Sequence, residues 1–439
     1  MKKVFFILSI FLLLFPFFSN AQEKPEKWTL NACLDYALEH NIQVKKSMVN
    51  FLSGKEDYLQ AKAQLFPSLS ASSSHNFANY PSSNTDDNNS YTGSYGLNAS
   101  LKLFDGGRRL NAIKQEELQT QASQLDVEQS EDDIRIALIQ AYMQVLYAYE
   151  SVKINQNTVE VSKAQLNRSE ELYKAGSISK VDLSQIESQY STDKYQLVVA
   201  ETNLATYKLQ LKQLLELEIE EEIELDIPEL TEEDILAPLP EKQVIYATAL
   251  SVMPEMKSSK LNVDISELEI KKAKAGYLPS LSLSAGIGTG HSSGTGITFK
   301  DQLWDRFSES VGLTLSIPIF SNRENKTAVN KAKFAVTTNQ LELINTQKNL
   351  LKTVEGLYLD ATSSQNQYLA AQDRLGAVAQ SYKQTEEQFF LGMKNTLELL
   401  TEKSNWLTAQ QEILQTKYMA IMSIQLLNIY QKKEIDDKL

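Results

Sequence analysis

A glycine turn flanked by seven-residue apolar repeats occurs twice, and it constrains the fold more than any other feature. The two turns contain Gly176 and Gly392, which lie 216 residues apart. Each glycine has an aromatic residue three positions before it, an acid six positions after it and a leucine seven positions after it. Glycine is favoured directly after a helix because it adopts the left-handed conformation without steric cost. Since Ser179 and Asn395 stand where a helix N-cap belongs, each turn is predicted to be the tip of a helical hairpin.

Apolar residues recur every seven positions before each turn. In the first copy these residues are Leu138, Val145, Val152, Val159, Leu166 and Tyr173. The residues 216 positions further along are Val354, Ala361, Tyr368, Leu375, Tyr382 and Phe389, again apolar or aromatic. A seven-residue period sustained over this length indicates left-handed supercoiling of packed helices. Two hairpins that match position for position indicate a duplication, with the chain built as two structural repeats.

In the middle of each repeat the apolar period falls from seven to two. A proline, Pro67 or Pro279, ends the preceding helix and begins an extended segment. Alternation of apolar residues with serine, glycine and other small polar residues then predicts two β hairpins, at about 68–104 and about 280–320. Strands of this kind suit a membrane barrel with a wet lumen. The same alternation is found in ordinary soluble hairpins, but the long helices leave no hydrophobic layer for a soluble sheet to cover.

The N-terminus has the pattern of a secretory signal peptide, predicted at residues 1–21. Lys2 and Lys3 precede an apolar run, and small residues before Gln22 provide the cleavage site. The formal net charge of −13 argues against nucleic acid and against a polybasic membrane-binding patch. Because no other apolar stretch is long enough for a spanning helix, strands must carry an exported chain of this kind across a membrane.

The chain is therefore expected to consist of two repeats joined by an acidic linker. Repeat 1 is predicted at 22–217, the linker at 218–240, repeat 2 at 241–432 and a charged tail at 433–439. Each repeat contains a helix, a hairpin, a long helix (about 108–174 or 325–391), the glycine turn and a final helix. The first helix, predicted as continuous from Trp28 to Leu65, and the helix after the turn together match one long helix in length. We expect them to stack end to end in a cylinder on the order of 100 Å tall.

The sequence contains no recognisable catalytic or metal-binding constellation. His40, His75 and His291 have no ligand-spaced neighbours, and Gly106-Gly107-Arg108 lacks the Lys-Ser/Thr pair of a phosphate loop. Cys33 is the only cysteine and is interpreted as a small apolar residue on a helix. We therefore expect neither enzymatic activity nor a cofactor.

The order and spacing of these features resemble the TolC-like outer-membrane efflux proteins over essentially the whole mature chain. The shared features are the helix–Pro–strand junctions, the two hairpins, the long helices and the paired Tyr/Phe-x-x-Gly turns followed by an acid. The resemblance implies a mostly α chain with a membrane β-barrel portion, in which three copies form a twelve-stranded barrel and a helical periplasmic tunnel. It also implies the outer membrane of a Gram-negative bacterium, a periplasmic adaptor and an inner-membrane pump as partners, and export of small molecules or polypeptides.

The resemblance further assigns a gate to the two turns. In the family, an acid six positions after the first glycine bonds to two residues near the second glycine. One is a tyrosine before that glycine and the other is a base after it. These positions hold Asp182, Phe389 and Lys394, so Asp182 and Lys394 are expected to be able to pair, whereas Phe389 has no hydroxyl to donate. An inner ring of carboxylates is expected at Glu398. The companion acid three residues further on is replaced by Thr401, with Glu402 one residue later.

Docking of the adaptor is expected at the exposed turn residues Gly176, Ser177, Gly392 and Met393. Alternatively, Asp182 and Glu398 are solvated acids at helix starts, where the helix dipole favours them. A secreted coiled-coil structural protein or adhesin is the alternative for the whole chain, but it does not account for the duplicated β hairpins. A periplasmic adaptor has only one long helix pair. Heat-resistant oligomers that conduct ions across bilayers distinguish a channel from both.

Overall fold

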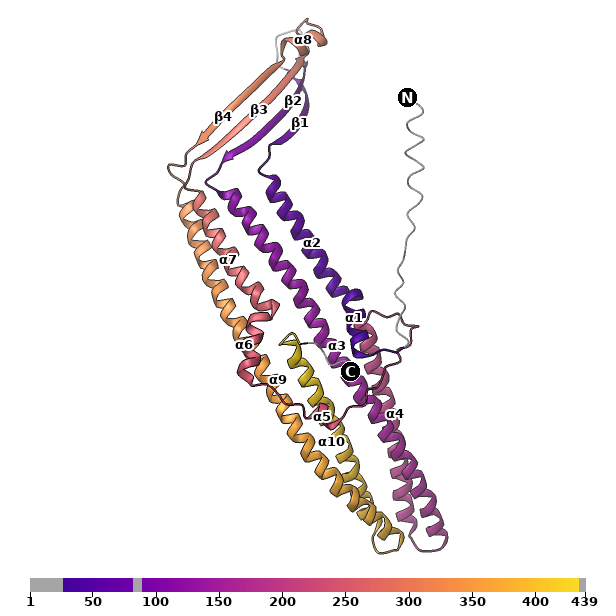
Figure 1. Cartoon of the computed structure of the whole chain (residues 1–439). Coiled ribbons are helices and arrows are strands. Elements are labelled where there is room, and N and C mark those ends of the chain that lie inside the picture. The colour runs from indigo at the N-terminus through magenta and orange to yellow at the C-terminus, as the bar shows by residue number, and fades with distance from the viewer. Residues whose placement is uncertain (1–26, 82–88, 434–439) are drawn as a thin grey trace.

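The molecule is elongated, with a β-sheet at one end and helices over the rest of its length (Figure 1). The computed structural model describes residues 27–81 and 89–433. The predicted signal peptide, the loop around Asp86 and the tail beyond Lys433 lie outside the described residues.

Two hairpins form a four-stranded sheet in the order β1-β2-β3-β4, with every neighbouring pair antiparallel. The strands are β1 (Ser68–Asn79), β2 (Asn89–Phe104), β3 (Ser280–Ser292) and β4 (Ser308–Ser316). These bounds confirm both predicted hairpins, except that β4 ends before Ile317. The residue that follows is Pro318, which has no backbone N–H to donate to a ladder.

The register gives the sheet one apolar and one polar face, because directly paired residues point to the same side. One row across all four strands is Leu69, Ala99, Ala285 and Val311. The adjacent row is Ser70, Asn98, Gly286 and Ser310. The alternation seen in the sequence therefore becomes two continuous surfaces of opposite polarity.

The helices of the two repeats correspond one to one. The first repeat contains α1 (Leu30–His40), α2 (Ile42–Ala63), α3 (Arg108–Lys174) and α4 (Lys180–Leu214); the second contains α6 (Lys242–Val252), α7 (Pro254–Ala275), α9 (Glu324–Phe390) and α10 (Thr396–Ile429). Both long helices, α3 and α9, have 67 residues. As predicted, α2 and α4 pack end to end along α3, and α7 and α10 do so along α9 (Figure 1). Within the described residues, no helix has the combination of length and apolar character needed to span a membrane.

The prediction of one continuous helix from Trp28 to Leu65 is wrong, because the chain breaks at Asn41. The Asn41 backbone is extended, its side-chain oxygen accepts from the Gln43 N–H at 2.8 Å, and its Nδ2 donates to the Leu214 carbonyl at 3.1 Å. The equivalent break in repeat 2 falls at Met253, directly before Pro254. Asparagine competes with helical backbone bonds and proline disfavours helix at the preceding residue, so two different residues produce the same break.

The acidic linker packs against the N-terminal segment at mid-height. The linker forms a single parallel bridge between Trp28 and Leu225, followed by the short helix α5 (Glu232–Ile235). The Tyr142 hydroxyl fixes this bridge by donating to the Asp226 carbonyl at 2.8 Å.

The segment between β3 and β4, at the tip of the second predicted hairpin, contains regular structure. β3 extends to Ser292, and residues Phe299–Asp305 form the short helix α8.

The largest core cluster lies where α1, α3, α10 and the linker meet, around Leu138, Tyr142 and Leu146. Cys33 belongs to this cluster and is fully buried, as predicted, and burial raises the pKa of its thiol to about 12. Two smaller clusters lie between α6, α7 and α9 and near the glycine turns. The core is therefore a series of seams between long helices.

Candidate functional site at the helical tip

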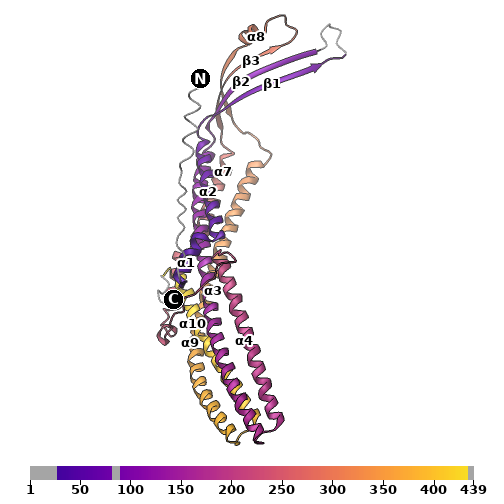
Figure 2. The same ribbon diagram turned by 90° about the vertical axis from the view of Figure 1, so that its right-hand side faces the viewer.

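The two glycine turns have the same geometry and form the end of the molecule opposite the sheet (Figures 1 and 2). Gly176 and Gly392 have φ values of 74° and 73°. Two backbone bonds close each turn. In the first, the Ser177 N–H donates to the Leu172 carbonyl at 2.8 Å and the Gly176 N–H to the Tyr173 carbonyl at 2.9 Å. In the second, the Met393 N–H donates to the Gln388 carbonyl and the Gly392 N–H to the Phe389 carbonyl, both at 2.9 Å. These are the bonds of a Schellman motif, which confirms that each glycine takes the left-handed conformation at a helix end.

The acid that follows each turn closes a capping box. The Asp182 N–H donates to the Ser179 Oγ at 3.1 Å, and the Ser179 N–H donates to the Asp182 Oδ2 at 3.2 Å. Asn395 and Glu398 make the same reciprocal pair at 2.9 and 3.1 Å. Each acid thereby satisfies a backbone donor at a helix start. One carboxylate oxygen remains in each case for a further partner.

The second oxygen of Asp182 connects the two turns. Thr396, buried at the start of α10, donates its hydroxyl to the Asp182 Oδ1 at 2.8 Å. Lys394 pairs with Glu398 of its own turn, with 2.5 Å between Nζ and Oε1. The structure therefore brings Asp182 to the second turn, but within one chain its partner is Thr396 and not Lys394. The pKa of Asp182 is lowered by the hydrogen bonds from Ser179 and Thr396, and that of Glu398 by the bond from Lys394.

Phe389 lies inside the tip core. It is 4% exposed and belongs to a cluster with Ile186, Tyr382 and Leu399. Its ring also meets that of Phe390 edge-on, with 5.3 Å between centroids. Phe389 therefore stabilises the tip by packing, in keeping with its lack of a hydroxyl.

A polar group next to this core links α3 to α9. Gln165 donates from Nε2 to the Tyr382 hydroxyl and to the Glu386 carboxylate, both at 2.5 Å. Burial is the main cause of the raised pKa of the Tyr382 hydroxyl. The sequence analysis did not identify this contact, because a glutamine on a helix face gives no local indication of a partner 217 residues away.

A buried ion pair joins the two hairpins above the tip core. Lys403 on α10 is 1% exposed, and its Nζ lies 2.7 Å from the Asp193 Oδ2 on α4 and 2.5 Å from the Ser162 Oγ on α3. Gln189 donates to the other Asp193 oxygen at 2.8 Å. Each charge is thus surrounded by polar partners, as burial requires. Sequence reasoning missed this group; its only indication was a lysine four residues after the buried Leu399.

The two residues considered for a second acidic ring have local partners. Thr401 donates to the Leu397 carbonyl at 2.8 Å, and Glu402 accepts from the Ser381 hydroxyl of α9 at 2.9 Å. Glu402 therefore contacts the neighbouring helix of its own hairpin.

Apolar side chains form an exposed rim around the two turns. The predicted docking residues Gly176, Ser177, Gly392 and Met393 are all exposed. The larger exposed apolar residues beside them are Val181, Leu391, Met393 and Leu397. An apolar surface at the end of a charged helical bundle is typical of a protein-binding site.

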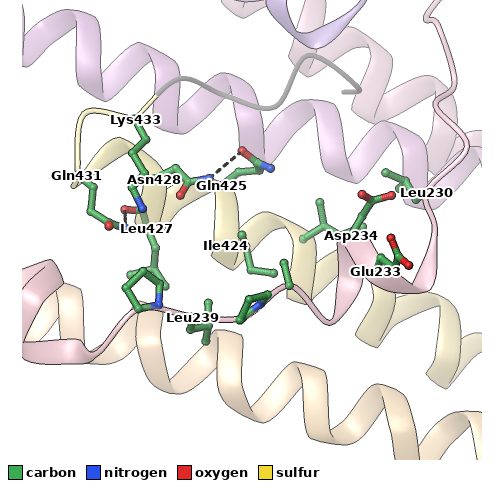
Figure 3. A pocket seen from close by; sticks show the side chains of 14 residues that line it. Leu230, Glu233, Asp234, Leu239, Ile424, Gln425, Leu427, Asn428, Gln431 and Lys433 are labelled. Atoms are coloured by element: carbon green, nitrogen blue, oxygen red, sulfur yellow. Dashed lines mark hydrogen bonds between the residues drawn. The ribbon is translucent and has the colours of Figure 1, made fainter.

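Away from the tip, the clearest cavity has a volume of about 400 Å³ and lies between the linker and the end of α10 (Figure 3). Leu230, Leu239 and Ile424 supply apolar lining. Asp234 at its rim accepts from the Thr231 hydroxyl and N–H in a capping box of α5. Among residues 27–81 and 89–433, no group of three or more His, Cys, Asp or Glu side chains is arranged to hold a metal ion.

Comparison with known proteins supports one family. The family described as "Outer membrane efflux protein" matches the chain twice, at residues 33–216 and 245–428. The chain is 22% identical to "Outer membrane protein TolC" of Escherichia coli (strain K12), over 86% of this chain and 77% of that protein. It is also 22% identical to "Proteases secretion protein PrtF" of Dickeya chrysanthemi, over 88% of this chain and 84% of that protein.

Solved structures show the same fold at low identity. A crystal structure of CusC has a TM-score of 0.80 and 19% identity, covering 92% of each chain. The outer membrane protein VceC of Vibrio cholerae has a TM-score of 0.79 and 16% identity, covering 93% of this chain and 97% of that one.

Proposed function

The chain belongs to the outer membrane efflux protein family, and from that membership we propose that three copies form one channel for export across the outer membrane. The observation that carries this proposal is the sheet with two open edges, β1 and β4. Four strands are too few to enclose a pore, whereas three chains supply twelve. Closure leaves no unpaired edge, as a strand in lipid requires.

The two faces of the sheet fit lipid outside and water inside. On β4 the apolar residues Val311, Leu313 and Leu315 are all exposed in the single chain. The opposite face consists of small polar residues and glycine, among them Ser70, Ser72, Ser94, Gly96, Asn98, Ser282, Ser284, Gly286, Ser310 and Gly312. Exposed aromatic residues lie at both ends of the sheet, with Phe66 and Phe320 near the helices and Phe77 and Tyr80 near the loops. Such girdles are typical of barrels at membrane–water interfaces.

The partners we propose are a periplasmic adaptor, docked at the apolar rim of the turns, and an inner-membrane pump. Relatives of the chain include secretion and efflux proteins, and both polypeptides and small molecules are therefore candidate cargo. A wide lumen lined by serine and glycine suits cargo of either class.

We further propose that the tip is the gate. In the trimer, Lys394 would form its ion pair with Asp182 of a neighbouring hairpin in place of Glu398. The three Glu398 carboxylates would then form a ring that favours cations. The present Lys394–Glu398 pair supports this because it places both groups at the same level of the second turn. The capping role of the two acids is compatible with the proposal, since each uses only one oxygen for its cap.

Electrophoresis and bilayer recording of the purified protein test the channel. We expect a band of three times the monomer mass in detergent that dissociates only on heating, and discrete ion-conducting steps in planar bilayers. A secreted coiled-coil protein or adhesin would remain non-conducting at every protein concentration, and that result would overturn the proposal.

A further inference from the structure

The helix α8, which interrupts the loop between β3 and β4, is held firmly against the sheet. Its buried residue Gln302 accepts from the Ser292 N–H at 2.7 Å and donates to the Ile297 carbonyl at 2.9 Å. The Thr289 hydroxyl donates to the Leu303 carbonyl at the other end. Two of these contacts are with β3, and they give the short helix a defined orientation on the sheet.

The contacts of α8 place it on the apolar face. Thr289 and His291 follow Ile287 in the same period-two alternation, so all three side chains point to the apolar side of β3. The Phe299 ring of α8 meets the His291 ring at 70°, with 4.7 Å between centroids. α8 therefore covers the apolar surface at the end of the sheet farthest from the helical bundle (Figures 1 and 2).

The exposed side chains of α8 and of the residues that flank it combine aromatic groups with balanced charge. Trp304 is 83% exposed, and Ile297, Phe299 and Phe307 beside it are also exposed. The charged residues interleaved with them are Lys300, Asp301, Asp305 and Arg306, two of each sign. Tryptophan next to charged groups is typical of the boundary between lipid headgroups and acyl chains, because its ring is apolar and its N–H is polar.

Aromatic residues of the adjacent strands extend this surface. Tyr91 and Tyr95 of β2 point to the same face, where the Tyr95 ring stacks on His291 at 5.9 Å between centroids. The exposed Phe77 of β1 is paired with Tyr91. The apolar face of the sheet and the outer surface of α8 are thus one continuous surface.

We propose that α8 is an interfacial anchor, bound by lipids of the outer leaflet, with Trp304 inserted at the boundary between headgroups and acyl chains. This inference rests on the proposed function, since it requires the apolar face of the sheet to contact lipid. The occupant is lipid because the surface continues that face, and because its charges, with the exposed Glu309 of β4 included, sum to only −1, too little for a specific ionic partner. α8 would set the depth of the barrel in the membrane.

Tryptophan fluorescence tests the proposal, because the chain has only three tryptophans. Replacing Trp28 and Trp406 by phenylalanine leaves Trp304 as the single reporter. The trimer is reconstituted in phosphatidylcholine vesicles brominated either near the headgroup or near the acyl chain end. We expect bromines near the headgroup to remove most of the Trp304 emission, bromines near the chain end to remove less, and aqueous acrylamide to quench weakly.

A matched variant that retains only Trp406, which stacks on Tyr382 near the tip, should be insensitive to both brominated lipids. If the doubly substituted protein does not fold, the difference between wild type and Trp304→Phe gives the same readout. Strong acrylamide quenching of Trp304 without bromolipid quenching, in vesicles that conduct ions, overturns the anchor and leaves the channel intact. Failure of the wild type to enter vesicles or to conduct overturns the proposed function and the anchor together.

Discussion

At the residue scale, the two acids behind the glycine turns serve the fold and the proposed gate with different oxygens. Asp182 Oδ2 closes a capping box while Oδ1 accepts from Thr396, and Glu398 divides its oxygens between Asn395 and Lys394. The capping geometry requires a carboxylate three residues after the cap, which explains why both turns carry an acid at the same position. Helix formation and gating are therefore compatible requirements at these two positions.

Replacing Lys394 with alanine should raise the open probability of the channel in planar bilayers. A partly exposed ion pair stabilises a structure by only about 0–1 kcal/mol, but the threefold axis repeats it. Glu398→Gln should weaken selectivity for cations, because it removes the charge of the ring. Lys174→Ala is the matched control: it breaks an exposed pair with Glu171 beside the first turn, at 2.8 Å, and should change neither property. Unchanged conductance in Lys394→Ala together with unchanged selectivity in Glu398→Gln would move the gate elsewhere.

The tip should also loosen in acid through Asp182. Because hydrogen bonds from Ser179 and Thr396 lower its pKa, the carboxylate stabilises the closed tip at neutral pH. That contribution is lost as the pH falls through the lowered pKa, below the usual value of about 3.9 for aspartate. Bilayer recordings should show open probability rising in this acidic range, and Asp182→Asn should raise it at pH 7 and flatten the profile. A wild-type profile with the same acid response in Asp182→Asn would contradict this role.

Local chemistry made the turn and cap residues of the tip predictable from the sequence, whereas their distant partners depend on tertiary structure. The glycines, Ser179 and Asn395 were identified because turns and caps are determined within a few residues. Thr396 and Lys403 were missed because their partners lie more than 200 residues away along the chain. Phe389 belongs to the seven-residue apolar period, and its burial in the tip core agrees with that period.

At the element scale, each helical hairpin depends on a glycine in the left-handed conformation. A side chain added at that glycine would contact nothing. An added Cβ at Gly176 or Gly392 has no neighbour within 4 Å, so a substitution there affects only the backbone. The double variant Gly176→Val, Gly392→Val should disfavour each turn by roughly 1–3 kcal/mol. We expect normal trimer levels with lost transport, measured as cargo export in cells that also contain the adaptor and the pump.

The control for this experiment lies in the middle of α9. Gly356 and Gly376 also have nothing within 4 Å of an added Cβ, but their φ values are negative. Their replacement by alanine should leave transport unchanged and stabilise the helix by up to about 1 kcal/mol each. Full transport by the valine double variant would remove the turns from the docking surface.

The buried pair between α4 and α10 should hold the two hairpins together. Lys403→Met alone leaves Asp193 buried without its partner and should lower the free energy of unfolding by about 3–5 kcal/mol. The double variant Lys403→Met, Asp193→Leu removes both charges and should recover most of that loss. Thermal unfolding of the trimer in detergent measures both. If the single variant is as stable as the double variant, the pair does not join the hairpins.

A helix or strand was predictable where its apolar periodicity extends over many residues. The long helices and the hairpins extend over many periods, so their ends were predicted closely. The break at Asn41 and the seven-residue helix α8 are too short to interrupt or establish a period. In both places one side chain makes a contact outside its own helix: Asn41 donates to Leu214, 173 residues further along the chain, and Gln302 accepts from Ser292 at the end of β3.

At the scale of the whole molecule, two repeats form one body because they pack on each other along their length. Helix α3 of the first repeat contacts both α7 and α10 of the second, and the strands β2 and β3 join the two hairpins in one sheet. We infer that the repeats predicted at 22–217 and 241–432 are structural units that cannot bury their apolar seams alone. The two open edges of the sheet can pair with neighbouring chains, and the three copies that we propose would supply twelve strands.

Thiol accessibility in single-channel recordings tests this account most directly. Ser284 and its neighbour Leu283 point to opposite faces of β3, and Cys33, the only native cysteine, is buried and can be replaced by serine. In that background, a charged methanethiosulfonate reagent should reduce the conductance of Ser284→Cys in three successive steps, one for each subunit. The same reagent should leave Leu283→Cys unaffected, because lipid covers that face. Block of Leu283→Cys with no effect on Ser284→Cys, or the absence of conductance in both, would contradict a trimeric tunnel lined by the polar face of the sheet.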